Sequence, residues 1–241
     1  LEFSKEDWTF SMRHCLKLCG MGLPMGLQYS ITAIGSVILQ TAVNDMGSTY
    51  VAAVSAGSKI SMFMCCPFDA KGSTMATYGG QNVGARRLDR VDQGLKACIK
   101  MGIIYALVAL AFSIVFGKQL ALLFVKKEQI ELIGYIYEFV VINAAFYIFL
   151  ALVNIVRFMI QGLGYSTFAI LAGICEMIAR SVAGFVLVPH FGFICVSLGS
   201  PLAWVCADLF LIPAYLWVMK QLRRKFGENK ISRAKSATAT I

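Results

Sequence analysis

Charged side chains within apolar segments are the residues of this sequence best placed to do chemistry. Lys59, Asp69, Glu176, Arg180 and Asp208 each lie inside a long apolar run, whereas most other charged residues lie between the runs. A charge at bilayer depth costs at least about 2.5 kcal/mol, so such a residue faces the interior of a helix bundle or water. We therefore predict that these residues line a pathway for ions or polar molecules.

Uncharged polar residues follow the same pattern at helical spacing. At about 100° per residue, Gln28 begins a polar stripe in the first run, and Asn154 and Arg157 share a stripe in the fourth. A packing role is the alternative, because polar bonds between membrane helices contribute about 0.6 kcal/mol each on average. Glu176 and Arg180, at positions i and i+4, also fit a structural ion pair. The predicted pathway residues are Gln28, Lys59, Asp69, Asn154, Arg157, Glu176, Arg180 and Asp208.

The elements that position these residues are membrane-spanning helices. The chain has 241 residues, 58% of them apolar, and a mean hydropathy of +0.71. Soluble domains have roughly 45–50% apolar residues. Since one span needs about twenty apolar residues, the sequence predicts an all-α integral membrane protein with six spans. They cover residues 23–43, 51–78, 97–116, 132–158, 167–188 and 198–219, with a kink at Pro67 and an end at Pro189.

The distribution of basic residues predicts the orientation. With six spans, fourteen Lys and Arg lie on the side of the termini and three, Lys118, Lys126 and Lys127, lie on the other. Because basic loops stay in the cytoplasm, we expect a multi-pass protein of the cell membrane with both termini cytoplasmic. The net charge of +9 forms no single patch with interleaved aromatics, so the lipid bilayer, and not nucleic acid, is the predicted partner.

The two ends of the chain differ from its body. Residues 1–20 alternate charged and apolar residues, which predicts an interfacial amphipathic linker helix. Residues 21–220 form the six-span body, and residues 221–241 form a basic cytoplasmic tail, for which we expect disorder. The sequence begins at Leu1 and not at Met, which predicts either processing or a piece of a longer protein.

Several chemical functions find no support in the sequence. Cys15 and Cys19 are one helical turn apart, but no His or second Cys pair completes a metal site. The spans contain no nucleophile–base pair, so we predict neither an enzyme nor a bound cofactor. The segment GGQNVGA, residues 79–85, lacks the Lys of a phosphate-binding loop. We expect its glycines to let a helix end turn tightly beside the membrane.

Three motifs resemble a known family. Gly22-Leu23-Pro24 opens the first span, MATYGGQNVGA (residues 75–85) closes the second, and Arg157 with IQGLG (residues 160–164) closes the fourth. In this order they resemble the multidrug and toxic-compound extrusion (MATE) transporters. The resemblance extends over residues 8–225, and the GQNxGA element is its most specific part.

The resemblance implies a fold and a mechanism. Family members have two six-helix lobes, and this chain is similar to the C-terminal lobe of such a twelve-helix transporter. Its partner is then a missing N-terminal lobe or a second copy. Members export cationic, amphiphilic compounds in antiport with H⁺ or Na⁺; the alternative is a flippase of the same superfamily that moves lipid-linked oligosaccharides. Gln28, Asn143 and Asn154 occupy spans that carry acids in sodium-coupled members, so the coupling ion stays open.

Overall fold

The described part of the chain is an all-α bundle. The computed structural model describes residues 10–238, apart from the side chains of Lys17, Met21 and residues 228–238. Five helices are long and apolar enough to cross a membrane, or six if the bent pair α4–α5 is one span. This confirms the predicted fold class. The elements are α1 (Met12–Met46), α2 (Ser48–Gly84), α3 (Leu88–Ala121), α4 (Ile130–Ala145), α5 (Tyr147–Gly162), α6 (Thr167–Val182), a π-helical turn (Ala183–Leu187), α7 (Val188–Phe191) and α8 (Phe193–Thr238).

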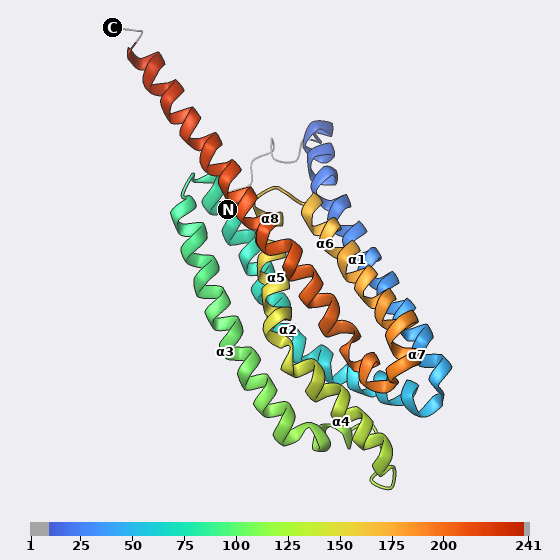
Figure 1. Cartoon of the computed structure of the whole chain (residues 1–241). Helices are drawn as coiled ribbons and strands as arrows, with labels where there is room; N and C mark the ends of the chain where they lie inside the picture. Colours follow the sequence, from blue (N-terminus) through green and yellow to red (C-terminus); the bar gives the residue numbers. More distant parts are fainter. Residues whose placement is uncertain (1–9, 239–241) are drawn as a thin grey trace.

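Helix α5 forms the centre of the bundle. Twelve of its 16 residues are buried, because α2, α3 and α8 all pack against it. The fully buried rings of Phe68 and Tyr147, 5.6 Å apart, join α2 to α5, and Trp204 adds α8 to the same core. Helices α1 and α6 run side by side along one edge, and α3 runs along the other (Figure 1).

The connections sort to the two ends of the bundle. The start of α1, the α2–α3 connection and the far part of α8 lie at one end (Figure 1). The α1–α2 turn at Gly47, the α3–α4 loop and α7 lie at the other end (Figure 1). Arg86 and Arg87 of the α2–α3 connection and Arg90 in the first turn of α3 therefore share an end with the basic part of α8.

The predicted fourth span is broken. Helices α4 and α5 meet at Phe146 with a bend of 51°. Just before the break, the buried Asn143 side chain donates hydrogen bonds to the Phe139 carbonyl at 2.8 Å and to the Ser197 carbonyl of α8 at 3.3 Å. A side chain that enters the backbone ladder is one of the few causes of a sharp helix kink. Asn143, a polar residue of this span, therefore contributes to its bend.

The first helix and the tail differ from expectation. α1 runs without a break from Met12, so Pro24 lies inside it and residues 12–20 form no separate linker helix; residues 1–9 lie outside the described residues. α8 continues through Thr238 where we expected disorder. Both stretches follow local propensity, because Leu, Met, Lys, Arg and Ala favour a helix in the absence of a stronger break.

The fifth span also runs past its predicted end. Pro189 does not stop it, since the proline lies in the first turn of α7, where a missing N–H removes no helical bond. The π-helical turn before it, Ala183–Leu187, joins α6 to this last turn. The chain leaves the helix at Gly192, whose φ of +68° favours glycine.

The motif glycines serve close packing and not the turn that we expected. Gly79 and Gly80 lie within α2, and a Cβ on Gly80 would lie 3.3 Å from the Gly162 carbonyl oxygen of α5. A Cβ on Gly162 would overlap the backbone of Ala76. Small residues thus let α2 and α5 approach closely, as is common between membrane helices. Among these motifs, only Gly164, with φ +90°, makes a turn that requires glycine.

The Gly162 contact gives a first testable prediction. Gly162→Ala should destabilise the bundle by about 1–3 kcal/mol, because the added methyl group forces α2 and α5 apart. The measurement is the thermal unfolding midpoint of the detergent-solubilised chain. Gly134→Ala is the control: a Cβ there meets nothing within 4 Å. It should leave the midpoint unchanged or raise it, and equal losses for both variants would contradict the close-packing role.

Candidate functional site

Three charged side chains meet inside the bundle. Arg157 of α5 and Arg180 of α6 both donate to Glu176 of α6, Arg157 through Nη2 to Oε1 and Arg180 through Nη1 to Oε2 at 3.3 Å. None of the three is more than 6% exposed. The predicted Glu176–Arg180 pair therefore exists, and it is extended by a second arginine from the neighbouring helix. We call these three residues the charged triad.

Asp208 of α8 is a second buried acid close to the triad. It is 4% exposed, and Arg157 and Glu176 are charged groups that act on it. Neither carboxylate oxygen of Asp208, however, accepts a hydrogen bond from any described residue. Asp208 is thus a buried acid with open acceptor positions.

A second polar bond ties α1 to the same region. Gln161, one turn after Arg157 on α5, donates from Nε2 to Oε1 of Gln28 at 2.7 Å. Both side chains are buried. Gly173 of α6 lies against Gln28, since a Cβ there would be 3.5 Å from its Cγ. The interior polar region therefore draws on α1, α5, α6 and α8.

Of the remaining predicted residues, Asn154 is buried, whereas Asp69 and Lys59 are exposed. Asn154 of α5 donates from Nδ2 to Oδ1 of Asp69 at 3.0 Å, and Asp69 is exposed on α2. Lys59 lies apart from both groups, with its Nζ 6.0 Å from the Phe124 ring centroid. The structure thus brings Gln28, Arg157, Glu176, Arg180 and Asp208 to one region, places Asp69 and Asn154 beside it, and leaves Lys59 separate.

Lys71 of α2 has an aromatic environment. Its Nζ lies 4.5 Å from the Tyr105 ring centroid and 5.3 Å from that of Phe68. A cation over aromatic faces gains roughly 0.5–2 kcal/mol. Tyr105 is fixed in turn by the hydrogen bond that its hydroxyl donates to the Met64 carbonyl at 3.0 Å. We therefore assign Lys71 to the packing of α2 on α3.

A small polar cavity reaches the charged triad. It has a volume of about 140 Å³ and lies between α1, α2, α4 and α8, with Arg180 in its wall. Its polar lining includes Ser36, Gln40, Ser58 and Ser200. Because one water takes up about 30 Å³ in the liquid, this volume has room for several. The cavity therefore provides polar groups and room for water beside Arg180.

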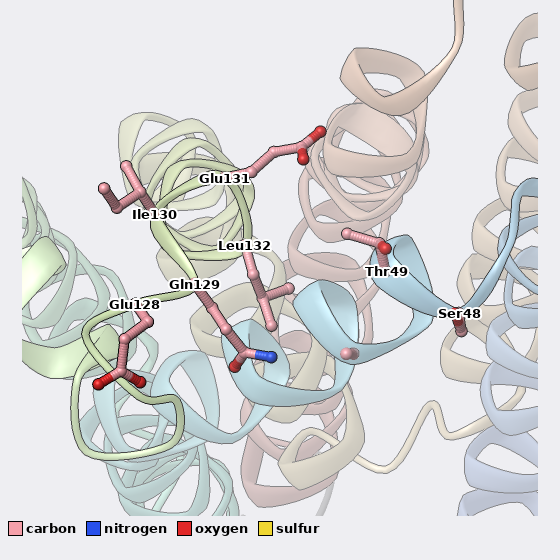
Figure 2. Close-up of a pocket in the computed structure, with 8 residues that line it drawn as sticks. Ser48, Thr49, Glu128, Gln129, Ile130, Glu131 and Leu132 are labelled. Carbon is pink, nitrogen blue, oxygen red and sulfur yellow. The ribbon is translucent and has the colours of Figure 1, made fainter.

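A larger hollow lies away from these residues. It has a volume of about 570 Å³ at the end of the bundle where α2 and α4 begin, between Ser48 and Leu132. Its two acids do not converge, since Figure 2 shows the carboxylates of Glu128 and Glu131 pointing in different directions. The hollow contains none of the predicted pathway residues, and we do not assign it a role.

A further ion pair, at one end of the bundle, was also not predicted from the sequence. Asp92 of α3 accepts a hydrogen bond from the Tyr215 hydroxyl at 2.9 Å and pairs with Arg223 of α8. It fastens α3 to α8 at the end of the bundle that carries the basic connections. The sequence signal for this pair was Asp92 itself, an acid close to the arginines that follow GGQNVGA. Its partners, Tyr215 and Arg223, are more than 120 residues away in the sequence, so the pairing could not be predicted.

Comparison with known proteins decides the family. The family model MatE matches residues 24–186, more than half of the chain. The chain belongs to the MATE family. A probable multidrug resistance protein of Bacillus subtilis (strain 168), YoeA, is 22% identical over 112 residues, 46% of this chain and 24% of that protein.

Solved MATE structures share the fold. An outward-facing multidrug resistance MATE transporter of the MOP superfamily superposes with a TM-score of 0.83 at 19% identity. A MATE protein in complex with MaL6 superposes with a TM-score of 0.81 at 18% identity. Each match covers 93% of this chain and 51% of the solved chain. The described helices therefore form one MATE lobe, and the chain spans about half the length of these relatives.

The triad predicts the effect of removing its shared acid. Glu176→Ala should destabilise the chain by about 3–5 kcal/mol, because it leaves two buried guanidinium groups without a counter-charge. The measurement is the denaturant concentration at the midpoint of unfolding of the chain in detergent. Glu128→Ala, at an exposed acid, is the matched control and should change stability by less than about 0.5 kcal/mol. Equal stability of both variants would show that Glu176 does not hold the arginines.

Proposed function

We propose that this chain is one lobe of a secondary active transporter that exports cationic, amphiphilic compounds. The observation that carries the proposal is an exposed polar stripe along α2, which includes Ser55, Lys59, Asp69, Ser73 and Thr77. These side chains lie at helical spacing on one face and within a membrane-spanning helix. Hydrocarbon does not solvate them, so the stripe must face a water-filled cavity or a second lobe.

The second lobe is either a missing N-terminal lobe or another copy of this chain. In both arrangements, the α2 stripe lines the cavity between the lobes, and Asp69 offers a carboxylate to a cationic compound. Membership of the MATE family and the half-length match to its solved structures support this arrangement. From the bias of basic residues, we place the lobe in the cell membrane with both termini cytoplasmic.

We propose antiport with H⁺ or Na⁺, with Asp208 as the residue that takes the coupling ion. A buried acid whose oxygens have no donor among the described residues has room to accept a proton or a cation. Glu176 is less suited to this role, because Arg157 and Arg180 already occupy both of its oxygens. The polar cavity at Arg180 supports access of water to this region.

The flippase alternative receives less support. A lipid-linked oligosaccharide carries phosphates, so its cavity should present unpaired basic residues. Arg157 and Arg180 instead pair with Glu176 inside the lobe, and Lys59 is the predicted basic residue that remains exposed. Drug efflux and flipping of a labelled polyprenyl pyrophosphate in proteoliposomes separate the two functions.

A charge-neutral substitution tests the role of the triad in transport. In cells that lack other efflux pumps and express the complete transporter, Glu176→Gln should reduce dye efflux about tenfold, equivalent to 1.4 kcal/mol. Glutamine retains the shape of the Glu176 side chain, but the counter-charge of both arginines is lost. The measurement is accumulation of a panel of cationic dyes, normalised to the amount of folded transporter in the membrane.

Lys118→Ala provides the control for this experiment. Lys118 is exposed at the far end of α3, and its loss should leave dye accumulation close to that of the parent protein. Equal effects of the two substitutions would return Glu176 to a packing role. Unchanged accumulation of every dye with the parent transporter would overturn the proposed export function itself.

A further inference from the structure

The outer face of α8 changes from apolar to basic along its length. Leu202, Leu209 and Leu216 repeat at about 100° per residue on one side of this helix, and Lys220 and Arg224 continue the same side. Leu209 and Leu216 are 72% and 64% exposed. Since apolar side chains face hydrocarbon and basic ones face headgroups, the bilayer surface crosses α8 between Leu216 and Lys220.

An apolar groove occupies the hydrocarbon part of this face. It lies between α6 and α8, has a volume of about 480 Å³, and is lined by side chains such as Ile178, Val182, Leu202 and Leu209. Almost none of its lining is polar. Such a surface suits a hydrocarbon chain and offers no bond to a polar molecule.

A basic hollow occupies the headgroup part of the same face. It has a volume of about 430 Å³ and is lined by Leu216, Met219, Lys220, Arg223 and Arg224. Arg223 is held in place by Asp92 of α3. Among the described residues, no acid pairs with Lys220 or Arg224, so their charges are available to an anion.

Aromatic residues mark the same level of the membrane. Trp217 packs against Tyr165 of the α5–α6 connection and Phe168 in the first turn of α6, with ring centroids 6.2 and 5.6 Å apart. Trp and Tyr concentrate at the headgroup level because their rings are apolar and carry one polar group. The basic hollow therefore lies at the membrane surface on the side of the basic connections.

We propose that α8 binds one anionic phospholipid, with an acyl chain in the apolar groove and the phosphate on Lys220 and Arg224. The spacing supports this, since the 11 residues from Leu209 to Lys220 span about 16 Å of helix. One leaflet of the hydrocarbon core is about 15 Å thick. Basic hollows beside membrane helices on the cytoplasmic side are recurrent sites for anionic headgroups. The site depends on the position of α8 in the membrane and does not require the proposed transport activity.

Titration of the purified chain with phosphatidylglycerol, followed by native mass spectrometry, tests the headgroup contact. Each basic side chain near an anionic surface contributes about a fivefold change in affinity. The double variant Lys220→Gln/Arg224→Gln should therefore bind phosphatidylglycerol about 25 times more weakly. Lys220→Arg/Arg224→Lys should retain binding, and Lys126→Gln/Lys127→Gln, at the other end of the bundle, should match the parent chain.

The groove and the lipid headgroup have separate tests. Ala179→Phe, which fills the groove, should weaken the binding of phosphatidylglycerol. Phosphatidylcholine with the same acyl chains should bind the parent chain more weakly than phosphatidylglycerol does. Inorganic phosphate should not displace the lipid; displacement would assign the hollow to a free phosphate. Unchanged binding of phosphatidylglycerol by Lys220→Gln/Arg224→Gln would overturn the proposal. A chain that retains no lipid and forms a dimer abolished by Ala179→Phe would assign the groove to a second copy.

Discussion

Neutralisation of charge in a medium without water is the constraint on which the lobe depends. Arg157, Glu176, Arg180 and Asp208 come from three helices, and each is at most 6% exposed. Removal of Glu176 leaves two buried guanidinium groups without a counter-charge, which costs more than the pairing itself contributes. The Arg157–Glu176 pair therefore holds α5 and α6 in one relative orientation.

The lobe keeps two kinds of polar residue apart. The charged triad has its counter-charges within the fold, whereas the α2 stripe has few partners and lies exposed. A paired interior suits a rigid body, and an unpaired outer face suits contact with water or with a second surface.

Hydropathy and helical spacing predicted an all-helical membrane fold, because both depend on local sequence. Five helices, or six if the bent pair α4–α5 is one span, are long and apolar enough to cross a membrane. They did not predict the Arg157–Glu176 pair, which depends on how α5 and α6 are rotated against each other. The break at Phe146 needed the Asn143 bond to α8, and the role of Gly162 needed the backbone of α2. The predicted end of the fifth span at Pro189 was wrong, because a proline in a first helical turn removes no helical hydrogen bond. Except at Pro189, each of these misses involves a contact between residues of different helices.

Helix α5 joins the exposed face to the buried charges. Asn154 binds Asp69 of the α2 stripe, and Arg157, one turn further along the same helix, binds Glu176 beside Asp208. The close contact of Gly80 with Gly162 fastens α2 to the far end of this helix. A compound bound at Asp69 and an ion bound at Asp208 would therefore act on neighbouring residues of one packed helix. Coupling between two sites needs such a shared element, whose position both ligands bias.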